Sequence, residues 1–103
     1  MNSVTAIART GMHSAMQRIA VAAHNVAISP VEGARRQVVS QQTLADGGVE
    51  ASIKQAPEPG ASLVEGLTQD LVEQKVATYA FKANLRIVEV EQEMLGSLLD
   101  EKV

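Results

Sequence analysis

The chain has 103 residues, of which 46% are apolar and only 2% aromatic, with no tryptophan and no cysteine. This length allows one domain with a modest core, and the scarcity of aromatic rings favours helix–helix packing. Without cysteine there are no disulfides, thiolate metal sites or cysteine nucleophile, and a net charge of −3 argues against general nucleic-acid binding.

Polar residues interrupt the apolar residues near the start of the sequence, among them Arg9, His13, Gln17 and Arg18. A secretory signal needs an unbroken apolar run after a basic segment, and a membrane-spanning helix needs a longer one still. We therefore expect neither, and expect any export to use a route without a cleaved signal.

Charge is divided unevenly along the chain. Residues 1–54 hold five basic and three acidic side chains, a net +2, whereas residues 55–103 hold four basic and nine acidic side chains, a net −5. Opposite signs favour pairing between the two segments, within one chain or between chains. The alternative is that these charges are scattered and solvated, since an exposed pair contributes only ~0–1 kcal/mol.

Apolar periodicity predicts a first helix from about Ser3 to Ala27, within an N-terminal unit of residues 1–29. Ser3 can cap its start, and Ser29-Pro30 ends it because proline disfavours helical geometry at the preceding residue. Gly33 then supplies a turn. The apolar arc of this helix consists of Val4, Ala8, Met12, Ala15, Met16, Ile19, Ala22, Ala23 and Val26.

Residues 30–61 form the predicted middle region. Alternating apolar and polar residues predict a β-hairpin from Arg36 to Gln55 with an irregular tip at residues 45–48. Gly47-Gly48 does not match a phosphate loop, because no helix start with Lys-Ser/Thr follows it. A lone hairpin is marginal in water, so this one must lean on a helix or a neighbouring subunit. The prolines and glycine of residues 55–61 predict a linker.

The second predicted helix runs from Ser62 to Lys102, within a unit of residues 62–103, and Ser62 and Glu65 have capping-box spacing. Its apolar surface covers more than half the helix circumference, whereas packing on one partner needs a stripe of roughly 100°. We therefore expect more than one partner for this helix. One apolar stripe consists of Phe81, Leu85, Val88, Leu95 and Leu99, and a second of Val76, Ala83, Ile87, Val90, Met94 and Leu98.

Asn84 and Glu91 are polar residues within this broad apolar face, seven positions apart. A polar residue in a helical seam can fix register and partner number at a cost in stability. We interpret Asn84 as such a residue. The alternative for each is a place at a groove edge, in contact with solvent or a backbone group, and for Glu91 neither interpretation is preferred.

The remaining polar residues do not indicate an enzyme. His13 and His24 would lie roughly 16 Å apart along a helix, too far to share a metal, so we expect them at the surface. No nucleophile elbow or oriented triad is present in the sequence. We interpret Met12, Met16 and Met94 as core filler. No metal site, catalytic residue or cofactor is expected.

Two segments carry a family resemblance. Arg18–Gly33 resembles the N-terminal signature of bacterial flagellar axial proteins, in which a helix ends in Asn-Asn-Ile/Leu-Ala-Asn before a short turn and glycine. Asn25, Ala27 and Gly33 match it, whereas His24 and Ile28 stand where asparagine is usual.

The C-terminal segment resembles the matching signature, Tyr-x-x-Asn followed by Glu-Met-Leu. Asn84 matches, and Phe81 replaces the tyrosine. The residues that carry this match, and that the resemblance assigns to assembly, are Phe81, Asn84, Leu85, Val88, Met94 and Leu95.

Order and spacing of the two signatures resemble the small proximal rod proteins of the flagellar basal body. The resemblance implies a mainly α fold: two long terminal helices in an antiparallel hairpin or coiled coil, with the β-hairpin between them. It also implies export through the flagellar type III apparatus, and polymerisation with itself and other rod proteins into the periplasm-spanning rod. A helical adaptor or chaperone of a secretion system is the alternative from another functional class.

Overall fold

A computed structural model describes residues 4–31, 33–56 and 63–102 of the protein. The described residues form helix α1 (Val4–Ile28), strands β1 (Gln37–Thr43) and β2 (Val49–Gln55), and helix α2 (Leu63–Lys102). The molecule is elongated, with extents of 65 × 25 × 14 Å. The prediction of a mainly α fold, with a small hairpin between two long helices, is confirmed.

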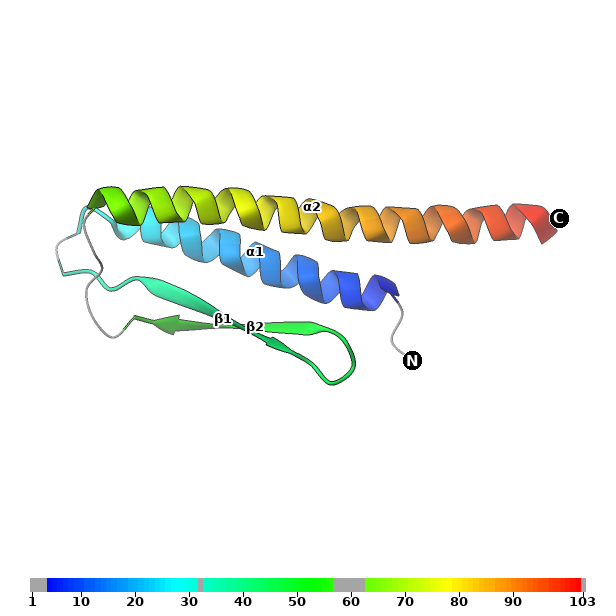
Figure 1. The fold of residues 1–103 in the computed structure, drawn as a ribbon, viewed down its shortest axis with the longest axis horizontal. Helices are drawn as coiled ribbons and strands as arrows, with labels where there is room; N and C mark the ends of the chain where they lie inside the picture. Colours follow the sequence, from blue (N-terminus) through cyan, green and yellow to red (C-terminus); the bar gives the residue numbers. More distant parts are fainter. Residues whose placement is uncertain (1–3, 32, 57–62, 103) are drawn as a thin grey trace.

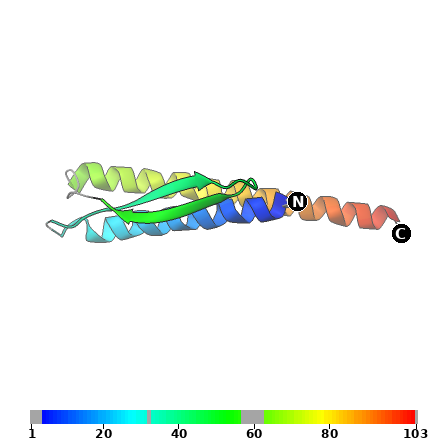
Figure 2. The same cartoon turned by 90° about the horizontal axis from the view of Figure 1, so that it is seen from below.

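Helix α1 is the middle layer of the molecule. It packs against α2 on one side and carries the β-hairpin on the other, and the two helices run in opposite directions (Figure 1). Seen from below, the hairpin lies in front of the helix pair (Figure 2). Because α2 is longer than α1, its C-terminal part extends beyond the start of α1 (Figure 1).

Small side chains make the core. Among the described residues, the buried apolar side chains are Ala8, Ala15, Val21, Ala22 and Ala77, none of them larger than valine. Alanine lets two helix backbones approach closely but removes little apolar surface from water, about 0.8 kcal/mol for each buried methyl-sized group against 1.5–3 kcal/mol for a leucine. The interface between the helices is therefore tight but weakly apolar.

The hairpin is antiparallel, with Val39 opposite Ile53 and Thr43 opposite Val49. At its tip the Leu44 amide donates to the Gly48 carbonyl at 2.7 Å, and the Gly47 amide donates back to the Leu44 carbonyl at 3.1 Å. Gly47 has φ +95°, which explains a glycine there. The predicted tip at residues 45–48 is thus correct.

The predicted element boundaries agree with the structure to within about a residue. Helix α1 ends at Ile28, and the Ser29 hydroxyl donates to the Val26 carbonyl at 2.8 Å, just before Pro30. The proposed caps Ser3 and Ser62 lie outside the described residues, as does most of the predicted linker.

The interpretation of the methionines as core filler is wrong for two of them. Met16 is 50% exposed and Met94 is 62% exposed, and Val4, also placed on the apolar arc of α1, is 57% exposed. Alanines form the centre of the interface between the helices. The larger side chains lie beside this interface and stay exposed to solvent.

Gly33 offers a test of the turn after α1. Its φ of +77° disfavours any side chain, although no described atom lies within 4 Å of an added Cβ. Gly33→Ala should therefore destabilise the fold by about 1–2 kcal/mol through the backbone alone, lowering the Tm measured by circular dichroism. Gly33→Asn should cost less, because asparagine tolerates this conformation.

Gly96→Ala is the matched control, since it adds the same methyl group at a helical position where a Cβ also meets open space. This variant should not lower the Tm, because alanine is the better helix former by about 1 kcal/mol. An equal loss of stability in both alanine variants would contradict a backbone origin.

Candidate functional site

The face of α2 that meets α1 carries a repeat of seven residues. Asp70, Ala77, Asn84 and Glu91 recur at this spacing, and Asp70 and Ala77 are 2% and 0% exposed. We call these four residues the α2 seam. Three of its four members are polar. The stability of the helix pair therefore depends on whether each of them has a hydrogen-bond or ion-pair partner.

Three contacts fix the register of the helix pair. The Thr5 hydroxyl donates to the Glu91 carboxylate, the Asn84 side chain lies against Gly11, and Arg18 Nε lies 2.5 Å from Glu73 Oε1. From Thr5 to Arg18 the residue numbers rise along α1, whereas those of the contacting residues on α2 decrease from 91 to 73. This is the order that two antiparallel helices require. The role of Glu91, open from the sequence, is thus a hydrogen-bonded contact within the chain.

Asn84 combines both interpretations weighed from the sequence. Its Nδ2 donates to the Ala80 carbonyl of its own helix at 2.9 Å, which is a backbone contact. Its side chain also occupies the space that the missing side chain of Gly11 leaves, and a Cβ at Gly11 would lie 2.7 Å from Asn84 Nδ2 and Oδ1. Within the chain, the Asn84 side chain therefore packs against α1 at Gly11.

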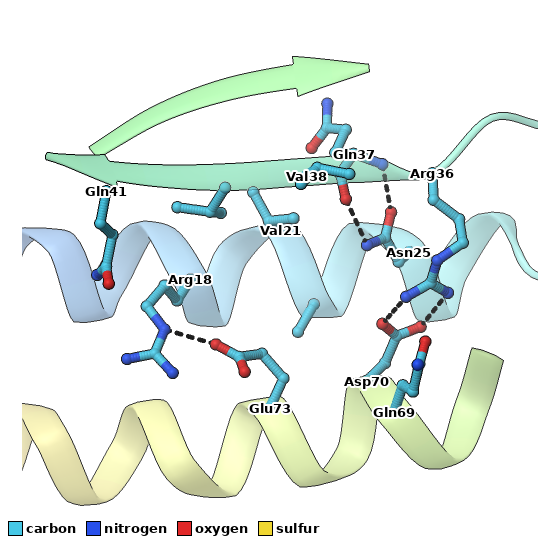
Figure 3. Close-up of a pocket in the computed structure, with 12 residues that line it drawn as sticks. Arg18, Val21, Asn25, Arg36, Gln37, Val38, Gln41, Gln69, Asp70 and Glu73 are labelled. Atoms are coloured by element: carbon cyan, nitrogen blue, oxygen red, sulfur yellow. Dashed lines mark hydrogen bonds and ion pairs between the residues drawn. The ribbon is translucent and has the colours of Figure 1, made fainter. Parts of the chain in front are cut away.

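Arg36 and Asp70 form a two-pronged ion pair that joins the start of the hairpin to α2. Arg36 Nη1 lies 2.8 Å from Asp70 Oδ2, and Nη2 lies 2.5 Å from Oδ1 (Figure 3). The Asp70 side chain is only 3% exposed and that of Arg36 24% exposed. The hydrogen bond to Asp70 raises the pKa of Arg36 above its ordinary value, against the opposing effect of burial. Arg36 therefore gives up its proton only at strongly alkaline pH.

Asn25 joins α1 to the first strand. Its Oδ1 accepts from the Gln37 amide at 2.8 Å, and its Nδ2 donates to the Gln37 carbonyl at 3.0 Å (Figure 3). Asn25 is 3% exposed. Its side-chain amide thus pairs both backbone groups of one strand residue, as a neighbouring strand would do.

Two further polar contacts hold the rest of the hairpin on α1. The Thr10 hydroxyl accepts from the Val49 amide at 3.0 Å, and the Gln41 side chain donates to the Ser14 hydroxyl. Both strands are otherwise largely exposed. The expectation that the hairpin leans on a helix is confirmed, and hydrogen bonds supply much of the attachment.

A shallow groove of about 530 Å³ lies where the hairpin, α1 and α2 meet, and the paired residues above line it. Both of its arginines, Arg18 and Arg36, are matched by carboxylates of α2. In the described part of the chain no three His, Cys, Asp or Glu side chains cluster to hold a metal. His13 and His24 are exposed, as predicted. The ion pairs and hydrogen bonds that line the groove connect the hairpin and α1 to each other and to α2.

The structure brings part of the predicted residue set to the helix interface. Asn25 is buried, and Phe81, Asn84 and Val88 are partly buried on the side of α2 that meets α1. Leu85, Met94 and Leu95 are 37%, 62% and 54% exposed. Ala27 is exposed, and Gly33 lies in the turn after α1.

The sequence reasoning missed Gly11, Arg36 and Asp70 as partners. Extending the spacing of Asn84 and Glu91 backward by seven residues reaches Ala77 and then Asp70, so the repeat itself could have indicated the seam. The expected pairing of the basic N-terminal segment with the acidic C-terminal one is confirmed by Arg18–Glu73 and Arg36–Asp70.

The second apolar stripe predicted on α2 is exposed. We call it the outer stripe and define it as Val76, Ala83, Ile87, Val90, Met94 and Leu98. Exposure of its larger members ranges from 36% at Val90 to 62% at Met94. Burial differs along the first stripe: Phe81 and Val88 are partly buried, whereas Leu85, Leu95 and Leu99 are 37%, 54% and 65% exposed.

Comparisons with known proteins do not assign the chain to a family. No protein-family model matches the sequence, and no curated protein is significantly similar to it. Within the described residues, neither helix is long and apolar enough to cross a membrane.

The Asn25 contact predicts that Asn25→Leu leaves the Gln37 amide and carbonyl without their partner. The free energy of unfolding should fall by about 2–3 kcal/mol, and the Gln37 amide should exchange with solvent faster. Urea unfolding and hydrogen exchange measured by NMR test this. His24→Leu, the same substitution at the exposed neighbouring position, should change neither; unchanged exchange in Asn25→Leu would contradict the assigned contact.

The fit of Asn84 to Gly11 predicts coupling between the two positions. Gly11→Ala alone should gain little stability, because its methyl group displaces the Asn84 side chain and offsets the helix-propensity gain of about 1 kcal/mol. In an Asn84→Ala background the same substitution should show that gain in full. Urea unfolding of the four chains gives the coupling energy, and strict additivity would show that the two residues do not meet.

Proposed function

We propose that this protein is a structural subunit of the bacterial flagellar basal-body rod. It would polymerise through its terminal helices, with copies of itself and other rod proteins, into the torque-transmitting shaft. Resemblance of the segments around Asn25 and Asn84 to the axial-protein signatures supports the proposal, as does their placement on two long antiparallel helices. Asn25 binds the first strand of the hairpin, and Asn84 packs against Gly11 of α1. Both contacts are consistent with a structural role for the two signatures.

The observation that carries the proposal is the apolar surface of α2 that α1 leaves uncovered. Residues 92–100 of this helix are all exposed. They include Met94, Leu95, Leu98 and Leu99. Large contiguous apolar patches are rare on monomers and usually mark interaction sites. An exposed helix end that continues an existing helix–helix interface suits a subunit that receives the next helix in line.

The position of this surface suggests an open assembly. The C-terminal part of α2 extends past the start of α1 (Figure 1), and Leu95 and Leu99 follow Glu91 by four and eight residues, so they continue its α1-facing side there. A helix of a second subunit could bind to this end of α2. The surface with which it binds would differ from the α2 surface to which it binds. Such head-to-tail contacts do not close on themselves and build filaments, the geometry a rod requires.

The alternative is a helical adaptor or chaperone of a type III secretion system. The same uncovered end of α2 favours it, because an amphipathic helix of a partner could bind there in place of a neighbouring subunit. An adaptor would form a discrete complex of fixed stoichiometry, so assembly size separates the two functions.

The test is assembly of the purified full-length chain over a range of concentrations. Electron microscopy and sedimentation should detect filaments whose amount rises with concentration. Leu95→Ser/Leu99→Ser should reduce the filament yield at least tenfold, since burial of two leucines contributes roughly 3–6 kcal/mol. Leu71→Ser, a change at another exposed leucine outside both stripes, is the control. Only discrete particles at every concentration, or filaments unaffected by the double change, would contradict the rod function.

A further inference from the structure

The outer stripe has a charge pattern beside it that the helix pair does not use. On the exposed polar side of α2 the basic residues come first, Lys75, Lys82 and Arg86, and the acidic residues follow, Glu89, Glu93 and Asp100. Their contacts within the chain are weak: Arg86 reaches Glu89 at 3.5 Å and Glu93 at 3.9 Å, with all three side chains at least half exposed. Exposed pairs of this kind contribute ~0–1 kcal/mol.

This order of charges is self-complementary in one orientation. In an antiparallel pair of α2 helices centred near residue 88, Arg86 of one copy lies level with Glu89 of the other, to within about one residue or ~1.5 Å. By the same symmetry Lys82 lies level with Glu93, and Lys75 with Asp100. A parallel pair in register would instead place the charged sides of the two copies on opposite sides of the contact, where they could not pair.

The outer stripe is complementary in the same register. Ile87 lies level with Val90 of the second copy, and Ala83 with Met94, again within about one residue. The Ala83–Met94 pair sets a small side chain against a large one, which lets the two stripes interdigitate at that level. Apolar contacts and charges therefore specify the same alignment, although they belong to different residues.

We propose that the outer stripe is an isologous docking surface on which a second copy of this chain binds with its α2 antiparallel. This contact differs from the rod contact of the proposed function, which is centred on Leu95 and Leu99, although Met94 and Leu98 belong to both surfaces. An isologous contact closes after two copies and cannot extend a filament. The protein therefore has a closed dimer in addition to any open assembly.

The size of the surface sets the strength of the dimer. The stripe is about 33 Å long from residue 76 to residue 98 and one helix, about 10 Å, wide, which gives roughly 330 Å² per copy. A standard stable interface buries about 800 Å² per partner. We therefore expect a weak dimer that is populated beside the monomer and rises with concentration.

Charge reversal of the full-length chain tests the pairing by sedimentation equilibrium. Arg86→Glu faces Glu89 of the other copy, and Glu89→Arg faces Arg86 of the other copy, so each variant alone brings like charges together and should dimerise at least about tenfold more weakly. An equimolar mixture of the two should recover dimerisation, because each then finds its opposite. Arg35→Glu, at an exposed position in the turn before β1, should behave like wild type.

The absence of cysteine allows a test of orientation by pulsed electron paramagnetic resonance. Thr78→Cys and Ser97→Cys each introduce one exposed site for a nitroxide label. Along the helices, two labels at residue 78, or two at residue 97, should be separated by about 30 Å in the dimer. A mixture of the two labelled chains should add a short distance, because residues 78 and 97 of different copies lie side by side. Circular dichroism confirms that each variant retains its helices.

A wild-type chain that stays monomeric up to about 500 μM, charge-reversed variants that associate as well as wild type, or short distances between like labels would each overturn the inference. The proposed function fails separately. Dimers without filaments would support this contact and contradict the rod, whereas filaments that form without a closed dimer would do the reverse.

Discussion

The close contact between α1 and α2 is the constraint on which the rest of the structure depends. Alanines form most of it, with Gly11 giving space to Asn84 at one position. Small side chains let the helix backbones approach, but they remove little apolar surface from water, so packing alone stabilises the pair weakly. The larger apolar side chains of α2 lie beside this contact and extend past it. The surface available for partners follows directly from the choice of small residues inside.

Polar contacts supply the specificity that a core of alanines lacks. Asn25 pairs with the backbone of Gln37, and the ion pair of Arg36 with Asp70 connects the same part of the hairpin to α2. A buried carboxylate is expensive unless it is paired, and Asp70 is paired on both oxygens. These interactions have strict geometry, so they select one register of the helices and one position of the hairpin. A hairpin that would be marginal alone thereby becomes part of a defined protomer.

Helix α2 divides its circumference between different contacts. The α2 seam lies on the side that packs against α1. The outer stripe is exposed and has self-complementary charges beside it. After Glu91 the α1-facing side of α2 continues, but α1 does not cover it. A structural subunit of a filament needs this combination: one interface that defines the protomer and others that remain for its neighbours. The wide apolar surface predicted from the sequence is thus the sum of several surfaces, and α1 covers only one of them.

Local physical chemistry was enough to determine the elements. Helical periodicity, Pro30 after α1 and the alternating residues of β2 predict the two helices and the hairpin, because each depends on residues close together in the chain. Phe81 and Asn84 could likewise be assigned to the buried side of α2. The match of Gly11 to Asn84, the pairing of Asn25 with Gln37, and the exposure of Met16 and Met94 were decided by tertiary structure. Each depends on which segments meet and at what register, and periodicity within one helix carries no information about the position of its partner.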